Sequence, residues 1–331
     1  MSSANIKRWR KVKEFTGEPK LSDFDLVEEQ MSTDLQTGEI LLEALFLSLD
    51  PYMRIEPEHL GPDKTMFSEQ VGRVVASKNP AYPVGCVVVA FVGWRTLTVL
   101  SPDQPSLFGS LGRRVPDMGN LPASLALGCV GMTGLTAYFG VERGQPQGGQ
   151  TVLVSAAAGA VGSVAGQIAK MKGCTVVGSA GSKEKCNWLK QLGFDHVFNY
   201  KETTVDEALK SCVPHGIDLY IDSVGGNYTY DVVKGHMKVD GRIVVLGAIS
   251  TYNSDEPLVR DWSLYLVDKQ LTVIGTNVAR HTDRWHHATT QLLHWGKLHY
   301  RETITKGFQH APQAFIDLMR GRNIGKALVQ V

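Results

Sequence analysis

The second half of the chain alternates between short apolar runs and longer amphipathic stretches. The apolar runs are rich in β-branched residues and predict strands, at residues 151–155, 174–178, 196–200, 217–226, 241–250 and 271–278. The fourth of these strands runs into a glycine turn. The amphipathic stretches between them predict helices, at residues 160–172, 182–193, 203–213 and 230–239. Strands and helices that alternate at this spacing form βαβ units, so we expect a doubly wound parallel sheet with helices on both faces.

The first 125 or so residues follow a different pattern. Strand-like runs at residues 38–55, 70–94 and 97–100 are interrupted by glycine and proline, with no helical periodicity before about residue 123. This pattern is typical of antiparallel β structure. The last thirty or so residues combine an amphipathic helix with a terminal strand, so we expect them to return to the first domain. We therefore predict two domains in an α/β chain: a β domain of residues 1–125 completed by 303–331, and a parallel-sheet domain of residues 126–302.

Charge and composition narrow the classes of function. The 331 residues include 34 Lys and Arg against 33 Asp and Glu, so nothing favours nucleic acid or an anionic membrane as a partner. The basic N-terminus lacks the apolar core of a signal peptide. The five cysteines have neither metal-site nor redox spacing, which favours free thiols in a reducing cytoplasm.

The stretch SAAAGAVGSVAGQIAKMKG, residues 155–173, contains no charge before Lys170. A membrane span is one interpretation, because residues 144–169 carry no charge, but the four glutamines of that segment and its strand-like β-branched run argue against it. A helix packed tightly through small residues is a second. The third is a glycine-rich turn between strand and helix that binds a dinucleotide, with Ala156 in place of the first glycine of the usual fingerprint. Gly159 would let a pyrophosphate approach the backbone, and Gly162 would let the helix lie close to the strand. The N–H groups at the helix start would bind the phosphates.

The end of the next strand bears on the choice between NAD and NADP. An NAD site usually has a carboxylate there for the ribose 2′-hydroxyl. Residues 178–185 read GSAGSKEK, with Ser182, Lys183 and Lys185 at the start of the next helix and no carboxylate at the strand end. Hydroxyl and ammonium groups favour a 2′-phosphate, so we expect NADPH. The alternative is an ordinary solvated helix start, in which Glu184 offsets part of the charge.

Motifs along nearly the whole chain point to one family. They are LLEALFLSLDPYMR (41–54), LALGCVGMTGLTAYFG (125–140), AAAGAVGSVAGQIAK (156–170), GFDHVFNYK (193–201), LGAISTYN (246–253) and NIGKALV (323–329). With these motifs the chain resembles the leukotriene hydroxydehydrogenase branch of the zinc-independent medium-chain dehydrogenase/reductase superfamily. That branch includes prostaglandin reductases and plant and bacterial alkenal reductases.

The resemblance implies a GroES-like β domain that closes over a Rossmann domain, with NADPH in the cleft, and usually a homodimer. It implies reduction of the carbon–carbon double bond of α,β-unsaturated ketones and aldehydes, such as 15-oxoprostaglandins and 2-alkenals. Some members also oxidise the 12-hydroxyl of a leukotriene. The positions that match the family's cofactor contacts are Met132, Thr136, Gly159, Ala160, Val161, Gly162, Lys185, Tyr200, Ser223, Leu246, Gly247, Ala248, Ile249, Ser250, Tyr252, Thr276, Asn277, Val278 and Asn323.

Three segments depart from the family's pattern. Ser223 stands where the family has an Asn that contacts the cofactor. We expect this difference to weaken cofactor binding without abolishing it. Glu69 stands in a motif that the family reads GQQV, which we expect near the cleft. Residues 273–285, VIGTNVARHTDRW, differ from an aromatic-rich stretch of the mammalian enzymes. That stretch borders the substrate in the family, so the resemblance leaves the substrate preference of this chain open.

A mechanism without a metal is expected. The histidine-rich stretch 281–299 lacks the spacing of a metal site, and we interpret it as a solvated helix. Hydride transfer to the β-carbon of an enone leaves an enolate, which a hydrogen-bond donor must stabilise. Tyr252 and Tyr52 are the candidate catalytic donors, with ring packing as the alternative role of each. We expect Arg54 to bind Asp50 or a backbone carbonyl.

Two other functions stay open. One is an NADPH quinone reductase of the same superfamily, and the other is an NADPH-binding protein without turnover. The motifs around both ends of the cofactor argue against the second. The products of a single turnover with a quinone and with an alkenal would separate the first from an enone reductase.

Overall fold

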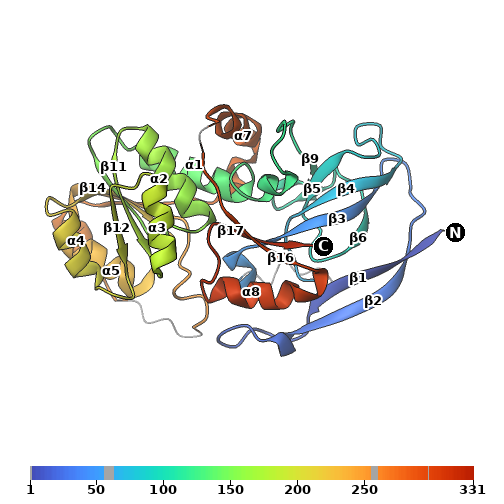
Figure 1. Cartoon of the computed structure of the whole chain (residues 1–331), viewed down its shortest axis with the longest axis horizontal. Coiled ribbons are helices and arrows are strands. Elements are labelled where there is room, and N and C mark those ends of the chain that lie inside the picture. The colour runs from blue at the N-terminus through green and yellow to red at the C-terminus, as the bar shows by residue number, and fades with distance from the viewer. Residues whose placement is uncertain (1, 56–62, 255–259, 297) are drawn as a thin grey trace. The chain divides into compact units, whose positions relative to one another are not determined.

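The computed structural model describes residues 2–55, 63–254, 260–296 and 298–331 (Figure 1). The chain divides into two compact units. One consists of Met1–Gly131 together with Glu302–Val331, and the other of Met132–Arg301.

The unit of Met132–Arg301 is built on a six-stranded parallel sheet. Its strands are β10 (Thr151–Val154), β11 (Thr175–Ala180), β12 (His196–Asn199), β13 (Ile217–Asp222), β14 (Met237–Val245) and β15 (Thr272–Gly275). They lie in the order β12-β11-β10-β13-β14-β15. The chain therefore winds outward from β10 in one direction and later in the other, which makes the β10–β13 junction a topological switch point. The predicted parallel sheet is confirmed.

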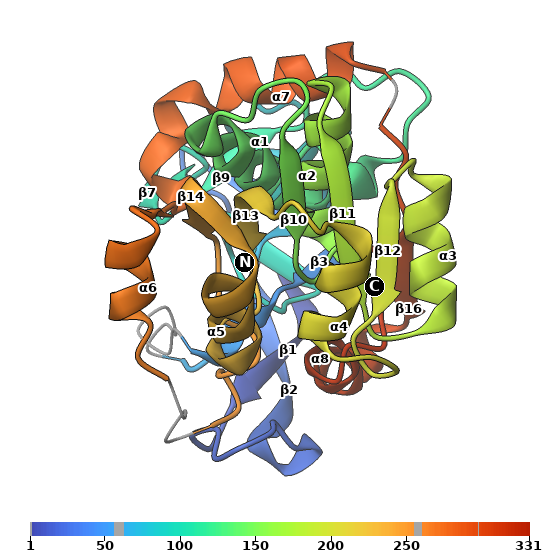
Figure 2. The same cartoon turned by 90° about the vertical axis from the view of Figure 1, so that its left-hand side faces the viewer.

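Helices cover both faces of this sheet (Figure 2). On one face α1 (Met132–Gly144) packs against α2 (Ala160–Met171), and on the other α4 (Val205–Cys212) packs against α5 (Gly226–Gly235). The remaining helices are α3 (Lys183–Gln191), α6 (Ser263–Asp268), α7 (Trp285–His294) and the 3-10 helix η5 (Val278–Arg284). In the part of the chain that the structure describes, no helix combines the length and apolar character that a bilayer span requires.

Several predicted elements end earlier than their patterns indicate, among them the helix at 230–239 and the strands at 241–250 and 271–278. The helix predicted for residues 230–239 is wrong in its second half, because α5 ends at Gly235 and β14 begins at Met237. The Ile217 amide donates to the His236 carbonyl at 2.8 Å and Ile217 pairs with Met237, which draws this segment into the sheet. The strand predicted for residues 241–250 likewise ends at Val245, and turns follow it.

The other unit is mainly antiparallel β structure, as predicted. Its largest sheet has the strand order β16 (Glu302–Lys306), β17 (Lys326–Gln330), β3 (Ile40–Leu49), β4 (Gln70–Ser77), β5 (Val87–Ala90) and β9 (Gly112–Arg114). Strand β6 (Leu97–Leu100) also pairs with β3. The terminal strand pairs antiparallel with β3, which confirms that the C-terminal segment returns to this unit. The elements are β1 (Ser3–Lys11), η1 (Leu21–Asp23), β2 (Phe24–Ser32), β3 (Ile40–Leu49), η2 (Pro51–Arg54), β4 (Gln70–Ser77), β5 (Val87–Ala90), β6 (Leu97–Leu100), β7 (Pro105–Ser106), β8 (Gly109–Ser110), β9 (Gly112–Arg114), η4 (Ala123–Leu127), β16 (Glu302–Lys306), η6 (Phe308–His310), α8 (Ala311–Met319) and β17 (Lys326–Gln330).

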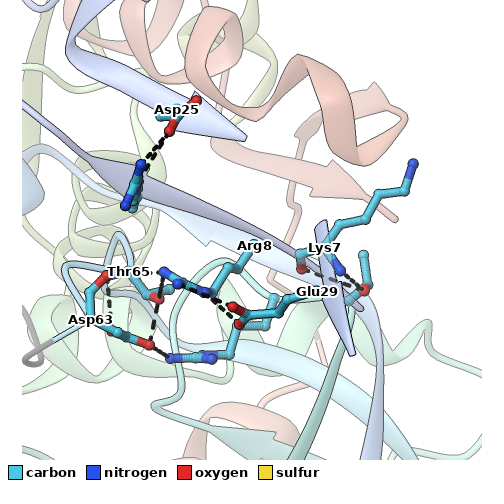
Figure 3. Close-up of polar contacts among 9 residues, drawn as sticks. Lys7, Arg8, Asp25, Glu29, Asp63 and Thr65 are labelled. Carbon is cyan, nitrogen blue, oxygen red and sulfur yellow. Dashed lines mark hydrogen bonds and ion pairs between the residues drawn. The ribbon is translucent and has the colours of Figure 1, made fainter. Parts of the chain in front are cut away.

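The two-stranded ribbon of β1 and β2 is attached to its unit by charged side chains (Figure 3). Arg8 Nε donates to Glu29 Oε1 at 2.8 Å, and Arg8 Nη1 donates to the Asp63 carbonyl at 2.9 Å. Arg95 pairs with the Asp63 carboxylate, so both arginines meet at one residue. Because Arg8 is buried, these hydrogen bonds offset the loss of its hydration.

A buried ion pair joins the C-terminal strand to the end of β3. Lys326 Nζ donates to Asp50 Oδ1 at 2.6 Å and to the Leu49 carbonyl at 2.8 Å, and both charged side chains are buried. We expected Arg54 to bind either Asp50 or a backbone carbonyl. The structure shows a backbone carbonyl as a partner, because Arg54 Nη2 donates to the Gly17 carbonyl at 2.9 Å. Removing either member of the Asp50–Lys326 pair would leave a buried charge without its partner.

The five cysteines are free thiols, as predicted, and most of them are inaccessible. Cys129, Cys174 and Cys186 are buried, and Cys86 and Cys212 are half-buried. Burial raises the pKa of all five thiols, that of Cys129 to about 12.

His236 couples the end of α5 to the start of α4. Its Nε2 lies 3.1 Å from Asp206 Oδ1, and its side chain is buried. Burial lowers the pKa of His236 below its ordinary value, as do the charges of Lys210 and Lys269, whereas Asp206 acts in the opposite direction. The folded protein therefore binds this proton less tightly than the unfolded chain does.

We expect the free energy of unfolding to fall as the pH drops below the ordinary histidine pKa of about 6.5 toward the lower folded value. Urea unfolding at pH 7.5 and 5.5 measures the loss, and His236→Gln should reduce the difference between the two pH values. An equal pH dependence in the variant would show that other groups cause it.

Candidate functional site

A tight turn connects β10 to α2 at the carboxyl end of β10. Ala156, in place of the fingerprint's first glycine, has a φ of +46°, in the left-handed region that glycine adopts more easily. The Ala157 amide donates to the Ser179 carbonyl at 3.0 Å, and the Gly159 amide donates to the Ala156 carbonyl at 2.9 Å. Gly159 is the N-cap of α2, and no side chain among the described residues caps this helix. The first N–H groups of α2 are therefore left for an external acceptor.

Gly159 and Gly162 meet different surroundings. A Cβ at Gly162 would lie 2.6 Å from the Ala156 carbonyl oxygen and 2.7 Å from Ala157 Cα, so α2 packs directly on the turn. A Cβ at Gly159 would approach only the Ala156 oxygen, at 3.2 Å, and its φ of −81° suits any residue. The fold therefore requires glycine at 162 and not at 159, whereas a pyrophosphate against the backbone would require it at 159.

Asp222 holds the ends of β10 and β13 together. Its buried carboxylate accepts hydrogen bonds from the Tyr220 hydroxyl (2.7 Å), Ser155 Oγ (3.2 Å) and Thr229 Oγ1 (2.5 Å). Ser155 Oγ in turn accepts from the Ser223 amide at 3.0 Å. The backbone of Ser223 is thus fixed at the switch point between the two strands.

The segment 246–252 folds over the turn that follows β13. The Leu246 amide donates to the Asp222 carbonyl at 2.7 Å, and the Ile249 amide donates to the Ser223 carbonyl at 3.1 Å. Ser250 Oγ donates to the Val224 carbonyl at 2.7 Å. The predicted residues of this segment and Ser223 therefore come together at one edge of the sheet.

Tyr252 turns back on its own segment. Its hydroxyl oxygen accepts a hydrogen bond from the Ala248 amide at 3.1 Å. A Cβ at Gly247 would lie 3.1 Å from the same oxygen, so the phenol rests against that glycine. The candidate donor is thus held at a defined place on the segment.

Ser182, Lys185 and Tyr200 come together at the ends of β11 and β12. Ser182 caps α3, and its Oγ accepts from the Lys185 amide at 3.3 Å. A Cβ at Gly181 would lie 2.6 Å from Tyr200 Oη and 3.2 Å from Lys201 Cε, so both side chains lie over this turn. Burial lowers the pKa of Lys185, as does the charge of Lys201, and burial raises the pKa of Tyr200. Hydroxyl and ammonium groups therefore gather where a phosphate could bind.

The residues after β15 are mostly engaged within the protein. The Thr276 amide donates to the Val245 carbonyl at 3.2 Å, but its buried Oγ1 has no hydrogen-bond partner among the described residues. Asn277 Oδ1 caps η5 by accepting from the Ala279 amide at 2.9 Å, and Val278 is buried. An orphaned buried hydroxyl is costly unless a ligand meets it, which singles out Thr276.

Met132 and Thr136 lie together on the first turns of α1. Thr136 Oγ1 donates to the Met132 carbonyl at 2.8 Å, and both residues are buried. This hydrogen bond within the helix already satisfies the Thr136 hydroxyl as a donor.

The unit that contains both chain ends holds the other expected residues. The Tyr52 ring lies 5.8 Å from the Phe67 ring, centroid to centroid, and Asn323 Nδ2 donates to the Gly325 carbonyl at 2.8 Å. Glu69 is buried and binds Arg113 Nη2 at 2.5 Å, so an ion pair within the unit accounts for this departure from the family pattern.

The described residues fit a nicotinamide dinucleotide in several respects. Gly159 leaves a cradle that a Cβ would narrow, Thr276 offers an unsatisfied hydroxyl, and the Lys185 cluster carries positive charge. All three lie at or just beyond the carboxyl ends of strands, where ligands bind in doubly wound sheets. Among the described residues, no group of three or more His, Cys, Asp or Glu gathers as metal ligands would.

Known proteins resemble the chain over its whole length. Prostaglandin reductase 1 of Bos taurus is 47% identical over 98% of this chain and 99% of its own length. The chain belongs to the prostaglandin reductase 1 family. The NADP(+)-dependent 2-alkenal reductase of Nicotiana tabacum is 39% identical over 96% of this chain and 94% of its own.

Family models and a solved structure agree with this membership of the prostaglandin reductase 1 family. The model described as the N-terminal domain of oxidoreductase matches residues 7–107, and the one described as zinc-binding dehydrogenase matches residues 160–295. The crystal structure of CurA in complex with NADPH from Vibrio vulnificus is similar with a TM-score of 0.86 and 35% identity, over 98% of this chain and 99% of that one. The two units are accordingly a GroES-like unit and a Rossmann-type unit.

Sequence reasoning missed Asp222 and Lys201 in this member of the prostaglandin reductase 1 family. An acidic residue at the end of the apolar run IDLYID was a signal for Asp222, because a buried carboxylate needs several donors. The signal for Lys201 was its place directly after Tyr200, in a motif already assigned to the cofactor.

We expect Gly162→Ala to lower the free energy of unfolding by about 2 kcal/mol or more, because its Cβ would meet backbone atoms that cannot move aside. Gly159→Ala is the matched control, with an expected loss below about 1 kcal/mol at this N-cap. Denaturant unfolding measures both. Similar losses in the two variants would contradict the close packing assigned to Gly162.

Proposed function

We propose that the protein reduces the carbon–carbon double bond of α,β-unsaturated ketones and aldehydes with NADPH. The expected substrates are lipid-derived enones, such as 15-oxoprostaglandins, and 2-alkenals. The observation that carries the proposal is the glycine turn before α2, because Gly159 is bare where the fold itself would accept a side chain. The names of the relatives, a prostaglandin reductase and an NADP(+)-dependent 2-alkenal reductase, support the substrate class and cofactor.

NADPH would be held along the carboxyl edge of the Rossmann-type sheet. The turn Gly159–Gly162 would bind the pyrophosphate through backbone N–H groups, and the cluster around Lys185 would bind the 2′-phosphate. When bound, NADPH supplies a hydride for the β-carbon of the substrate. The other proposed contacts are Met132, Thr136, Ala160, Val161, Ser182, Tyr200, Ser223, Leu246, Gly247, Ala248, Ile249, Ser250, Tyr252, Thr276, Asn277, Val278 and Asn323.

Tyr252 is the proposed donor to the oxygen on which negative charge develops. The Ala248 amide donates to the phenol oxygen at 3.1 Å, which orients the hydroxyl and polarises its O–H bond. A donor held in place before the reaction needs little reorganisation as charge builds up on an enolate oxygen. With the hydride on the β-carbon, the α-carbon of the substrate would take a proton from water or a tyrosine, which would complete the reduction of the double bond. Tyr52 is the second candidate donor.

The domain roles, assembly and location complete the proposal. We propose that the GroES-like unit contributes to substrate binding and the Rossmann-type unit binds NADPH.

We propose a homodimer, which is supported by strand β15 at the edge of its sheet and by Val273, which is 42% exposed. On α6, Leu264 and Val267 are 80% and 77% exposed. Sedimentation of the protein as a monomer at micromolar concentration would contradict the proposed homodimer.

The free thiols support location in a reducing compartment, the cytoplasm.

The decisive experiment follows NADPH absorbance with a panel of 2-alkenals, a 15-oxoprostaglandin, quinones and saturated aldehydes. We expect consumption with the first two classes and recovery of the saturated carbonyl compound. Consumption with quinones alone would favour a quinone reductase, and tight NADPH binding without turnover would favour a non-catalytic role.

Gly159→Ala is the control variant for this experiment. It should fold like the wild type yet lose most of its NADPH affinity, because its Cβ would enter the pyrophosphate cradle. Wild-type NADPH affinity in Gly159→Ala would overturn the placement of the cofactor at this turn.

We expect Tyr252→Phe to lower kcat by about 10- to 100-fold with little change in the Kd for NADPH, because the lost hydroxyl acts on the developing charge. Stopped-flow turnover and equilibrium NADPH titration separate the two effects. An unchanged rate of hydride transfer would remove Tyr252 from the mechanism.

A further inference from the structure

We propose that Lys201 binds the 2′-phosphate of NADPH together with Lys185 and so determines the preference for NADPH over NADH. The inference rests on the proposed function, which it deepens by assigning a second cation to the cofactor site.

The pairing of β11 with β12 brings Lys201 to the start of α3. Ala180 and Asn199, the last residues of the two strands, are partners in the parallel ladder. Beyond them, a Cβ at Gly181 would lie only 3.2 Å from Lys201 Cε, so the lysine stem lies across this glycine. Asn199 Oδ1 accepts a hydrogen bond from the Lys201 amide at 3.1 Å, an Asx turn that fixes the backbone just after β12.

The two lysines are close enough to influence each other. After burial, the charge of Lys201 is the largest cause that lowers the pKa of Lys185. Two ammonium groups repel each other unless an anion is bound between or beside them. A phosphate that contacted both ammonium groups would relieve this repulsion.

Glu184 offsets the effect of Lys201 only in part, because its charge raises the pKa of Lys185 by less than the charge of Lys201 lowers it. Glu184 stands next to Lys185 in the sequence, but its Oε1 lies 3.7 Å from Arg301 Nη1. In the described segments, no carboxylate forms an ion pair with Lys201, which is exposed. A phosphate monoester carries a charge of about −1.5 to −2 at neutral pH, so it matches two ammonium groups better than one.

The neighbouring groups complete a site for a phosphate on a ribose. Tyr200 Oη and Lys201 Cε both lie over Gly181, whose lack of a side chain leaves room for their approach. Ser182 supplies a hydroxyl on the same turn. NADH lacks the phosphate, so a lysine that contacts only this group should affect one cofactor and not the other.

The experiment compares Lys201→Gln with Lys185→Gln, the double variant and Lys190→Gln. Lys190 is exposed in the last turn of α3 and controls for the loss of one positive charge on the same helix. Isothermal titration with NADPH, NADH, 2′,5′-ADP and 5′-AMP gives the Kd of each ligand without any turnover.

We expect Lys201→Gln to raise the Kd for NADPH and 2′,5′-ADP about tenfold or more, the loss of one charge-assisted hydrogen bond. The Kd for NADH and 5′-AMP should change less than about twofold, and Lys190→Gln should behave as the wild type. Lys201→Arg should retain most of the NADPH affinity. Because both lysines contact one phosphate, the double variant should deviate from the sum of the single effects.

Equal losses for NADPH and NADH in Lys201→Gln, or a loss no larger than that of Lys190→Gln, would overturn the inference. A wild-type protein that bound NADH as tightly as NADPH would instead overturn the cofactor assignment of the proposed function. The two failures are distinguishable because the second appears before any substitution is made.

Discussion

Direct packing of α2 on the turn before it is the constraint from which the candidate site follows. Gly162 lets the helix approach Ala156 and Ala157 more closely than any side chain would allow. That approach brings the first N–H groups of α2 to the carboxyl end of β10. It also holds Ala156 in a left-handed conformation, which costs a non-glycine residue on the order of 1 kcal/mol. The hydrogen bonds from Ala157 to Ser179 and from Gly159 to Ala156 help to hold the turn in this state.

A second buried centre fixes the neighbouring turns relative to that one. The Asp222 carboxylate accepts hydrogen bonds from the hydroxyl groups of Ser155, directly after β10, of Tyr220 in β13 and of Thr229 in α5, so the ends of these elements cannot move independently. The Asp222 carbonyl also receives the amide of Leu246, which begins the segment that carries Tyr252. The position of the proposed donor thus depends on a residue that would not touch the substrate.

The sequence predicted the parallel sheet well, because β-branched runs and amphipathic stretches alternate without long interruptions. The association of Lys185 with Tyr200 came from the family resemblance and not from the hydrophobic pattern. The two residues follow β11 and β12, which are adjacent parallel strands. The hydrophobic pattern failed at residues 236–239, where Met237 and Val239 continue a helical pattern but His236 and Met237 are drawn into the sheet by Ile217. Lys201 and Asp222 were missed because their roles depend on tertiary neighbours, Gly181 for one and Ser155 and Thr229 for the other. No local pattern encodes such partners.

The environment of the cysteines matters for a protein that would handle conjugated carbonyl compounds. Such compounds alkylate proteins by adding to sulfur, and the reactive form is the thiolate. Here burial keeps each sulfur protonated at neutral pH, and Cys129, Cys174 and Cys186 are also shielded from solvent. The fold therefore gives an electrophile few reactive thiolates to attack, which protects the sulfur atoms of a catalyst exposed to its own reactive substrates.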